Sequence, residues 1–183
     1  MNTATLLRQF AVATALTVAS CQIAAEPPKK LDPLESATGA GEDPAMVAAE
    51  MAKWQGTWRC VERNEEGTLL PDEDVTKISM KIDENVFEFQ WGSEFREAGH
   101  YTLYPSATPK AVDIMIESPD ELAGRRLKLI YRMNGDATTM TTIHREDGQR
   151  PSEFTAEPDS GQTEEFWRKV VPPPPPSPEK KLP

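Results

Sequence analysis

The fold is decided by residues 78–91, which read ISMKIDENVFEFQW. Two runs in this stretch alternate apolar with polar residues, and their apolar members are Ile78, Met80 and Ile82, then Phe87, Phe89 and Trp91. Because successive side chains of a strand point to opposite faces, each run predicts a strand with one buried face. Only a few residues separate the runs, which predicts that the two strands are antiparallel neighbours.

The same period of two recurs along most of the chain. Further strands are predicted at residues 57–63, 97–103, 112–116, 127–131, 137–143 and 163–170, for a total of about eight. The connections are short, and Asn134-Gly135 is typical of a two-residue hairpin turn. Eight successive antiparallel strands can close into a barrel, which removes exposed sheet edges. The predicted fold class is therefore all-β, an antiparallel up-and-down barrel.

One short helix is predicted ahead of the first strand. Asp43 suits the N-cap and Pro44 the first helical position. Val47, Met51 and Trp54 follow at spacings of four and three, so that they form one apolar stripe.

The composition excludes several classes of protein. The 183 residues include 20 Lys and Arg against 30 Asp and Glu, for a formal net charge of −10. This excess of acidic residues argues against nucleic-acid binding, because neutralising phosphates needs a basic face. Hydrophobic residues make up 38% of the chain, which is enough to build a core. Two cysteines and two histidines leave little material for a disulfide framework or a zinc site.

The first 25 residues have the features of a secretory signal. Arg8 precedes an apolar run at residues 10–19, which is about half as long as a membrane-spanning helix. The cut falls either before Cys21, where VASC resembles the lipobox of bacterial lipoproteins, or after Ala25. We expect an exported protein of the periplasm or cell envelope. A lipid on Cys21 is its one predicted contact with the membrane.

The rest of the chain divides into a folded unit between two extended segments. Residues 21–43, after a signal peptide at 1–20, contain several prolines and glycines and few large apolar residues, which predicts a flexible tether. Residues 44–171 are long enough for one independent core. Residues 172–183 begin with five prolines and are predicted to form a solvated, Pro-rich disordered spacer.

Cys60 stays unpaired whichever cut is used, because Cys21 is either lipidated or removed. An unpaired cysteine outside the cell can be reactive, but inside a strand it is more often a small buried hydrophobe. We therefore expect Cys60 to be buried.

Several short motifs occur in order between residues 52 and 170. They are QGTW at 55–58, Gly67 through Leu70-Pro71, GHYTL at 99–103, PKAVDI at 109–114, RPSEF at 150–154 and Gly161-Gln162 before the last strand. Together they resemble a family of uncharacterised domains in exported proteins of planctomycete bacteria. That family has no agreed biochemical role, so the resemblance implies a fold, a lipocalin-like (calycin-type) barrel, rather than a reaction.

Gly56-x-Trp58 is itself similar to the lipocalin Gly-x-Trp motif at the start of the first strand. In lipocalins this Trp packs across the closed end of the barrel, under a basic residue from the last strand. The resemblance implies the same closure here, with Arg168 or Lys169 as the basic residue, because strand register leaves both neighbours open.

No set of residues predicts catalysis, a metal site or a cofactor. His100 and His144 lie on different predicted strands without metal-ligand spacing, and His144 is expected to be a surface residue at a strand end. The acidic run at 72–74 lacks the Gly and the terminal Glu of a calcium loop. Glu164 and Glu165 point to opposite faces of a strand and cannot share a proton, so solvated charge is expected at both acidic clusters.

Aromatic side chains are the best candidates for contact with a ligand. They are Phe87, Phe89, Trp91, Tyr101 and Tyr131. If the barrel is open at one end, the inward members of this set line a pocket; otherwise they fill the barrel. Asp113, Arg150 and Glu153 form a candidate polar group, either at the mouth of the barrel or as a structural ion pair.

Two functions follow from this interpretation. The favoured one is a non-enzymatic domain that binds a small apolar or amphipathic molecule inside the barrel. The alternative is a structural or interaction domain with a filled barrel, held on flexible arms to contact an envelope protein. Neither function involves nucleic acid.

Overall fold

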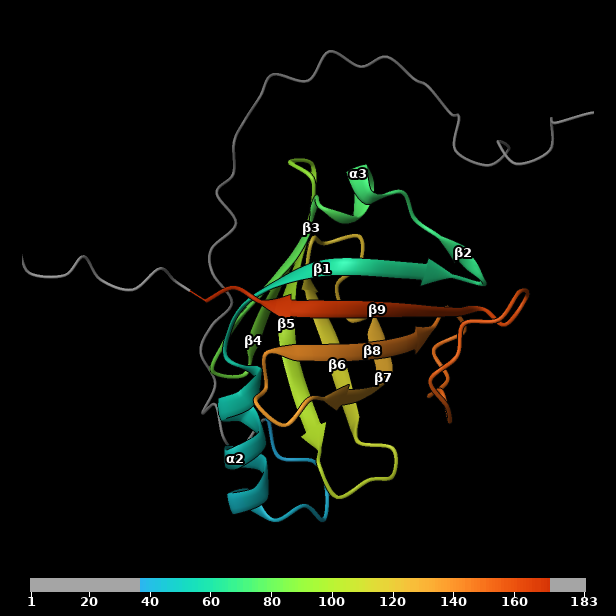
Figure 1. Ribbon diagram of the computed structural model, residues 1–183. Coiled ribbons are helices and arrows are strands. Elements are labelled where there is room, and N and C mark those ends of the chain that lie inside the picture. Colours follow the sequence, from blue (N-terminus) through green and yellow to red (C-terminus); the bar gives the residue numbers. More distant parts are fainter. Residues whose placement is uncertain (1–36, 172–183) are drawn as a thin grey trace, which may run out of the picture.

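The structure is a computed structural model that describes residues 37–171 (Figure 1). In chain order the elements are α2 (Pro44–Trp54), β1 (Gly56–Glu65), β2 (Thr68–Leu69), α3 (Asp72–Val75), β3 (Ile78–Asp83), β4 (Val86–Trp91), β5 (Phe95–Tyr104), β6 (Ala111–Ser118), β7 (Arg126–Met133), β8 (Thr139–Arg145) and β9 (Gln162–Lys169).

Eight of these strands form a closed antiparallel barrel. Each strand from β3 to β9 pairs with its neighbour along the chain, and β1 pairs with both β3 and β9. The β1–β9 ladder runs from Trp58↔Lys169 to Glu65↔Thr163 and closes the sheet on itself. The remaining strand, β2, adds two residues beside the end of β1 and was not predicted. The all-β, up-and-down barrel predicted from the sequence is confirmed.

A bulge in β1 turns one charged residue toward the interior. Trp58 and Cys60 are buried, and strict alternation would next bury Glu62. The register shifts between Cys60 and Glu62, so that Arg63 lies opposite the buried Glu165. A β-bulge inserts one extra residue in a strand and thereby changes the face to which the following side chains point.

A second register shift lies between Ala98 and Gly99 of β5, against β6. A Cβ atom on Gly99 would lie 1.9 Å from the backbone oxygen of Met115. The two backbones approach so closely that the position accepts only glycine.

Helix α2 lies at one end of the barrel (Figure 1). The side chain of Asp43 caps it by accepting a 2.9 Å hydrogen bond from the Ala45 N–H, and Pro44 occupies the first helical position, as predicted. Its buried face consists of Val47, Glu50, Met51 and Trp54. The predicted apolar stripe of Val47, Met51 and Trp54 is therefore confirmed, and the carboxylate of Glu50 is buried beside it.

Glu50 anchors this helix to the barrel. Its carboxylate accepts hydrogen bonds of 2.8 Å from both Lys53 and Lys110, and one of 3.2 Å from the hydroxyl of Tyr131. Burial by itself raises the pKa of Glu50, but the hydrogen bonds from Lys110 and Lys53 outweigh it, so the pKa is lowered. Glu50 therefore stays ionised in its buried position.

The ordered domain begins before residue 44. Ala37 is 0% exposed, Thr38 forms a parallel bridge with Leu103, and the Gly39 N–H donates to the Leu103 carbonyl at 3.2 Å. Residues 37–39, expected within the tether, thus pack on the barrel. The signal, Cys21 and the tail at 172–183 lie outside the described residues. Among residues 37–171, no helix is long and apolar enough to cross a membrane.

The turn between β7 and β8 differs from the prediction. β7 ends at Met133 and β8 begins at Thr139, so five residues connect them instead of two. The side-chain oxygen of Asn134 accepts the N–H groups of Thr138 and Thr139, at 2.9 and 2.8 Å. The prediction of a two-residue Asn-Gly turn was wrong. The Ala137 N–H donates to the Asn134 carbonyl at 3.0 Å to close a backbone turn inside a wider loop, which the Asn134 side chain caps.

Candidate ligand-binding cavity

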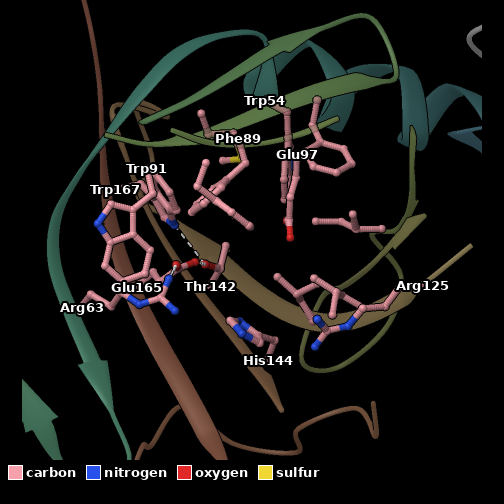
Figure 2. A pocket seen from close by; sticks show the side chains of 16 residues that line it. Trp54, Arg63, Phe89, Trp91, Glu97, Arg125, Thr142, His144, Glu165 and Trp167 are labelled. Carbon is pink, nitrogen blue, oxygen red and sulfur yellow. Dashed lines mark hydrogen bonds and ion pairs between the residues drawn. The ribbon is translucent and has the colours of Figure 1, made fainter. Parts of the chain in front are cut away.

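A cavity of about 150 Å³ lies inside the barrel, toward the end opposite α2 (Figure 2). Every barrel strand contributes to its wall. The lining residues are Trp54 from α2, Arg63, Met80, Phe87, Phe89, Trp91, Phe95, Glu97, Ile114, Arg125, Leu127, Leu129, Thr142, His144, Glu165 and Trp167. A dry apolar cavity of about 150 Å³ can hold a benzene-sized molecule, which sets the size class of any occupant.

The half of the barrel next to α2 is filled by aromatic side chains. The ring of Trp54 stacks on Tyr101, with centroids 5.6 Å apart, and meets Tyr131 edge-on at 4.8 Å. The hydroxyl of Tyr101 donates to the carbonyl of Glu84, and that of Tyr131 to Glu50. Both tyrosines were expected among the pocket candidates, but the structure uses them to close the barrel.

The lipocalin-type closure motif also lies at this end. Trp58 is fully buried and donates a 2.7 Å hydrogen bond from its indole N–H to the Trp54 carbonyl. The register pairs Trp58 with Lys169, whose Nζ sits 4.8 Å from the Trp58 ring centroid and donates to the Lys53 carbonyl. Arg168 is exposed, so Lys169 is the basic residue over the Trp. Gly56 begins β1 with a φ of +111°, a conformation that favours glycine.

The remaining candidates, Phe87, Phe89 and Trp91, line the cavity together on β4. Phe89 contacts Phe95 and Trp167 edge-on, each with centroids 6.3 Å apart. The rings of Phe89, Phe95 and Trp167 therefore form one aromatic cluster in the cavity wall.

Arg63 and Glu165 form a buried ion pair in the cavity wall. The second carboxylate oxygen of Glu165 accepts the Thr142 hydroxyl at 3.2 Å, and Thr142 in turn accepts the Trp167 indole N–H at 3.0 Å (Figure 2). Solvated charge was predicted for Glu165, but its exposed fraction is 5%. The prediction was wrong because even an acidic strand has an inward face, and Arg63 provides the counter-charge there.

Arg63 itself has three partners. It pairs with Glu165, donates from Nε to Glu65 at 2.7 Å, and lies over the Trp91 ring at 5.1 Å from the centroid. Its charge is therefore compensated within the wall of the cavity.

Three further polar groups face the cavity near its open end: Glu97, Arg125 and His144. Burial raises the pKa of Glu97, against the opposing effect of Arg125. Burial lowers the pKa of His144, which keeps the imidazole neutral at neutral pH. His144 was expected at the surface, but its place in β8, two residues after the inward Thr142, turns it into the barrel.

The last candidate polar group lies on the outside of the barrel. Asp113 pairs with Arg150, which also donates to the Leu129 carbonyl at 2.6 Å and sits over the Tyr104 ring at 5.5 Å. Glu153 is exposed, and within residues 37–171 the structure shows no ion pair between it and Arg150. Of the two interpretations, the arrangement is the structural ion pair, which fastens the segment after β8 to β6 and β7.

Cys60 is buried and unpaired, as expected. Its thiol donates to the Glu62 carbonyl at 3.2 Å, and burial raises its pKa to about 12. His100 pairs with Glu117 at 2.9 Å, away from His144. Among residues 37–171, no three His, Cys, Asp or Glu side chains lie close enough together to hold a metal ion.

Comparisons with known proteins add little beyond this geometry. No protein family and no curated protein match the sequence. The solved structures similar to the chain include an uncharacterised protein from Bacteroides eggerthii (12% identity, TM-score 0.41) and a lipocalin-like protein from Bacteroides uniformis (11%, 0.42). Each alignment covers 64% of this chain and 99% of the other. Since no family model matches, the resemblance to the planctomycete family has no support from the comparisons.

The charged residues of the cavity were missed at the level of sequence, although one signal for them exists. Glu97 is an even number of residues away from Gly99, Tyr101 and Leu103, so its side chain lies on the same, inward face of β5. A charged residue at an inward position near a strand end is typical of the mouth of a barrel. Arg63 carries no such signal, since it faces inward only because of the bulge.

Proposed function

We propose that the domain binds a small apolar or amphipathic molecule, about one ring in size, in the barrel cavity and carries out no chemistry on it. The observation that supports this most is the position of the cavity on the barrel interior, with walls from all eight barrel strands. Aromatic and aliphatic side chains supply contact area, while polar groups at one end can orient the ligand.

The distribution of polar groups supports an amphipathic ligand over a purely apolar one. Trp54 and Phe87 lie toward α2, whereas Arg63, Glu97, Arg125 and the other charged residues lie toward the open end, where β1 ends and β5 and β7 begin. A molecule with an apolar body and a polar head can enter with the body first and leave its head at the mouth.

The first test compares native and denaturing mass spectra of the full chain, and a bound ligand should appear as extra mass in the native spectrum alone. The second test titrates the full chain with 2-phenylethanol, a neutral single-ring probe. Because Trp54, Trp91 and Trp167 line the cavity, their fluorescence should change on binding. Ile114→Phe fills the cavity and should abolish the change. Met115→Phe adds the same ring on the outer face of β6 and should preserve it.

Folding of both variants is checked by urea unfolding, and Leu127→Phe replaces Ile114→Phe if the latter is unfolded. A protein without bound mass that ignores the probe would contradict the proposal. It would favour the alternative, an interaction domain with a filled barrel, and envelope cross-linking would then be the next measurement.

On the sequence alone, we propose that the protein is exported and anchored through a lipid on Cys21. Cell fractionation of the wild type and of Cys21→Ser tests the anchor. A soluble pool that does not change between the two would contradict it and favour cleavage after Ala25.

A further inference from the structure

Glu97 is surrounded by aromatic rings. In the β4–β5 ladder, Phe89 lies directly opposite Glu97, and Trp91 lies opposite Phe95. All four side chains line the cavity and therefore share the inner face of the sheet. Directly opposite residues are neighbours, and diagonal ones are within reach of long aromatic side chains. One carboxylate thus has a ring opposite, a ring along its own strand and a ring on the diagonal.

This carboxylate has no partner of its own. Within residues 37–171, the structure shows no hydrogen bond and no ion pair for the Glu97 side chain, although it is half-buried. Arg125 and Arg63 attract it only through space, Glu165 repels it, and burial raises its pKa. A desolvated carboxylate without a partner is unfavourable, and a cation placed beside it would remove the cost.

The surrounding rings favour the same occupant. The face of an aromatic ring carries negative charge density and attracts cations within about 6 Å of its centroid. A cation already rests on one of these rings, since the guanidinium of Arg63 lies 5.1 Å from the centroid of Trp91. Phe95 is 40% exposed and offers its ring at the entrance.

The charge balance argues against an organic anion. Arg63 is already paired with Glu165 and Glu65, and His144 is kept neutral by burial. Arg125 is exposed and is the one cavity-lining arginine of the described chain without an ion pair. An anion near it would also meet Glu97. The net charge of −10 attracts cations to the protein and repels anions.

We propose that the cavity binds a small organic cation, an ammonium group on a body of about one ring, with Glu97 as its counter-ion and Phe89, Phe95 and Trp91 around it. This inference rests on the ligand-binding function above and names the chemical class of the ligand. The apolar body points toward Trp54, and the ammonium group stays at the level of Glu97.

The experiment titrates the full chain near neutral pH with three probes of similar size: 2-phenylethylammonium, 2-phenylethanol and 3-phenylpropanoate. The ammonium should bind tightest. Glu97→Gln should weaken it roughly 10- to 100-fold, the range expected for losing a charge-assisted hydrogen bond, and should leave the alcohol within about twofold. Glu88→Gln removes an equal charge from the exposed outer face of β4 and should change neither probe.

Two more variants separate the ammonium from its competitors. Phe95→Leu keeps apolar bulk but removes a ring face, so it should weaken the ammonium more than the alcohol. Arg125→Gln should strengthen ammonium binding, because it removes a competing cation. If the ligand were an acid, the same variant would abolish binding of 3-phenylpropanoate.

The inference is overturned if the alcohol binds as tightly as the ammonium, if Glu97→Gln leaves ammonium binding intact, or if the carboxylate binds tightest. In each of these cases a single-ring probe still binds, and the proposed function stands. If none of the three probes binds, the proposed function and this inference fail together.

Discussion

Replacing Arg63 with methionine should destabilise the protein far more than the same replacement at Arg132. The two arginines pair with neighbouring glutamates of β9, Arg63 with Glu165 inside the barrel and Arg132 with Glu164 outside it at 3.8 Å. The side chains of the inner pair are 12% and 7% exposed, and those of the outer pair 61% and 26%. Methionine keeps apolar length while removing the charge, so the two variants compare the loss of a buried ion pair with the loss of an exposed one.

The expected loss in the free energy of unfolding depends on whether the glutamate that loses its arginine is buried or exposed. A buried carboxylate that loses its cation costs about 3–5 kcal/mol, whereas losing an exposed pair costs about 0–1 kcal/mol. With an m-value of about 2 kcal/mol per molar urea, the midpoint of Arg63→Met should fall by about 1.5–2.5 M and that of Arg132→Met by less than about 0.5 M.

The assay is urea unfolding followed by tryptophan fluorescence and far-UV circular dichroism. The double variant Arg63→Met/Glu165→Leu should recover much of the loss, since an apolar pair needs no counter-charge. If both single variants lose the same small amount, Glu165 is solvated in the native protein, which contradicts the buried ion pair described above.

Three other measurements test different parts of the structure. Gly99→Ala should lower the free energy of unfolding by about 3 kcal/mol or more, because its Cβ meets a backbone oxygen at 1.9 Å, whereas Gly135→Ala, with open space around its Cβ, should be neutral or slightly stabilising. Glu97→Gln should raise the melting temperature at neutral pH, because a raised pKa means that ionising Glu97 costs stability; the gain should vanish below the ordinary pKa of 4.5, where Glu97 is protonated in both states. Cys60 should react slowly with iodoacetamide in the native protein and rapidly in urea, because its pKa of about 12 leaves almost no thiolate at neutral pH.

Each of these expectations has an outcome against it. Equal stabilities for the two alanine variants would mean that the β5–β6 bulge can open without cost. A melting temperature lowered by Glu97→Gln would reveal a stabilising partner for the carboxylate. Fast labelling of native Cys60 would show that β1 and β9 separate readily, because the two strands pair at this residue.

The architecture could be predicted because its signals are local. Alternation in 78–91 and along the other runs reports which face of each strand is buried, without reference to any distant residue. Short connections then leave the up-and-down order as the simplest topology, and the N-cap at Asp43 marks the start of α2. All eight predicted strands and the helix are present. The missed strand, β2, spans two residues and is too short for any alternation to show.

The candidate site was predictable only in part. Phe87, Phe89 and Trp91 line the cavity because alternation placed them on one face. Alternation alone could not show that Tyr101 and Tyr131 meet Trp54 and close the barrel, since that depends on how far along the axis each residue lies. Within the lipocalin-like motif, the choice between Arg168 and Lys169 likewise depended on register across the β1–β9 ladder.

The sequence by itself thus determined an acidic chain, its strands and their order, and an aromatic interior. The tertiary structure alone decided that the interior is partly hollow and which charges face it. Arg63 and Glu165 are 102 residues apart in the chain. They meet because the bulge in β1 turns Arg63, instead of Glu62, toward the interior where β9 closes the barrel. Alternation is a property of one strand, whereas a site is made by the register between strands, and register is set only when the whole sheet closes.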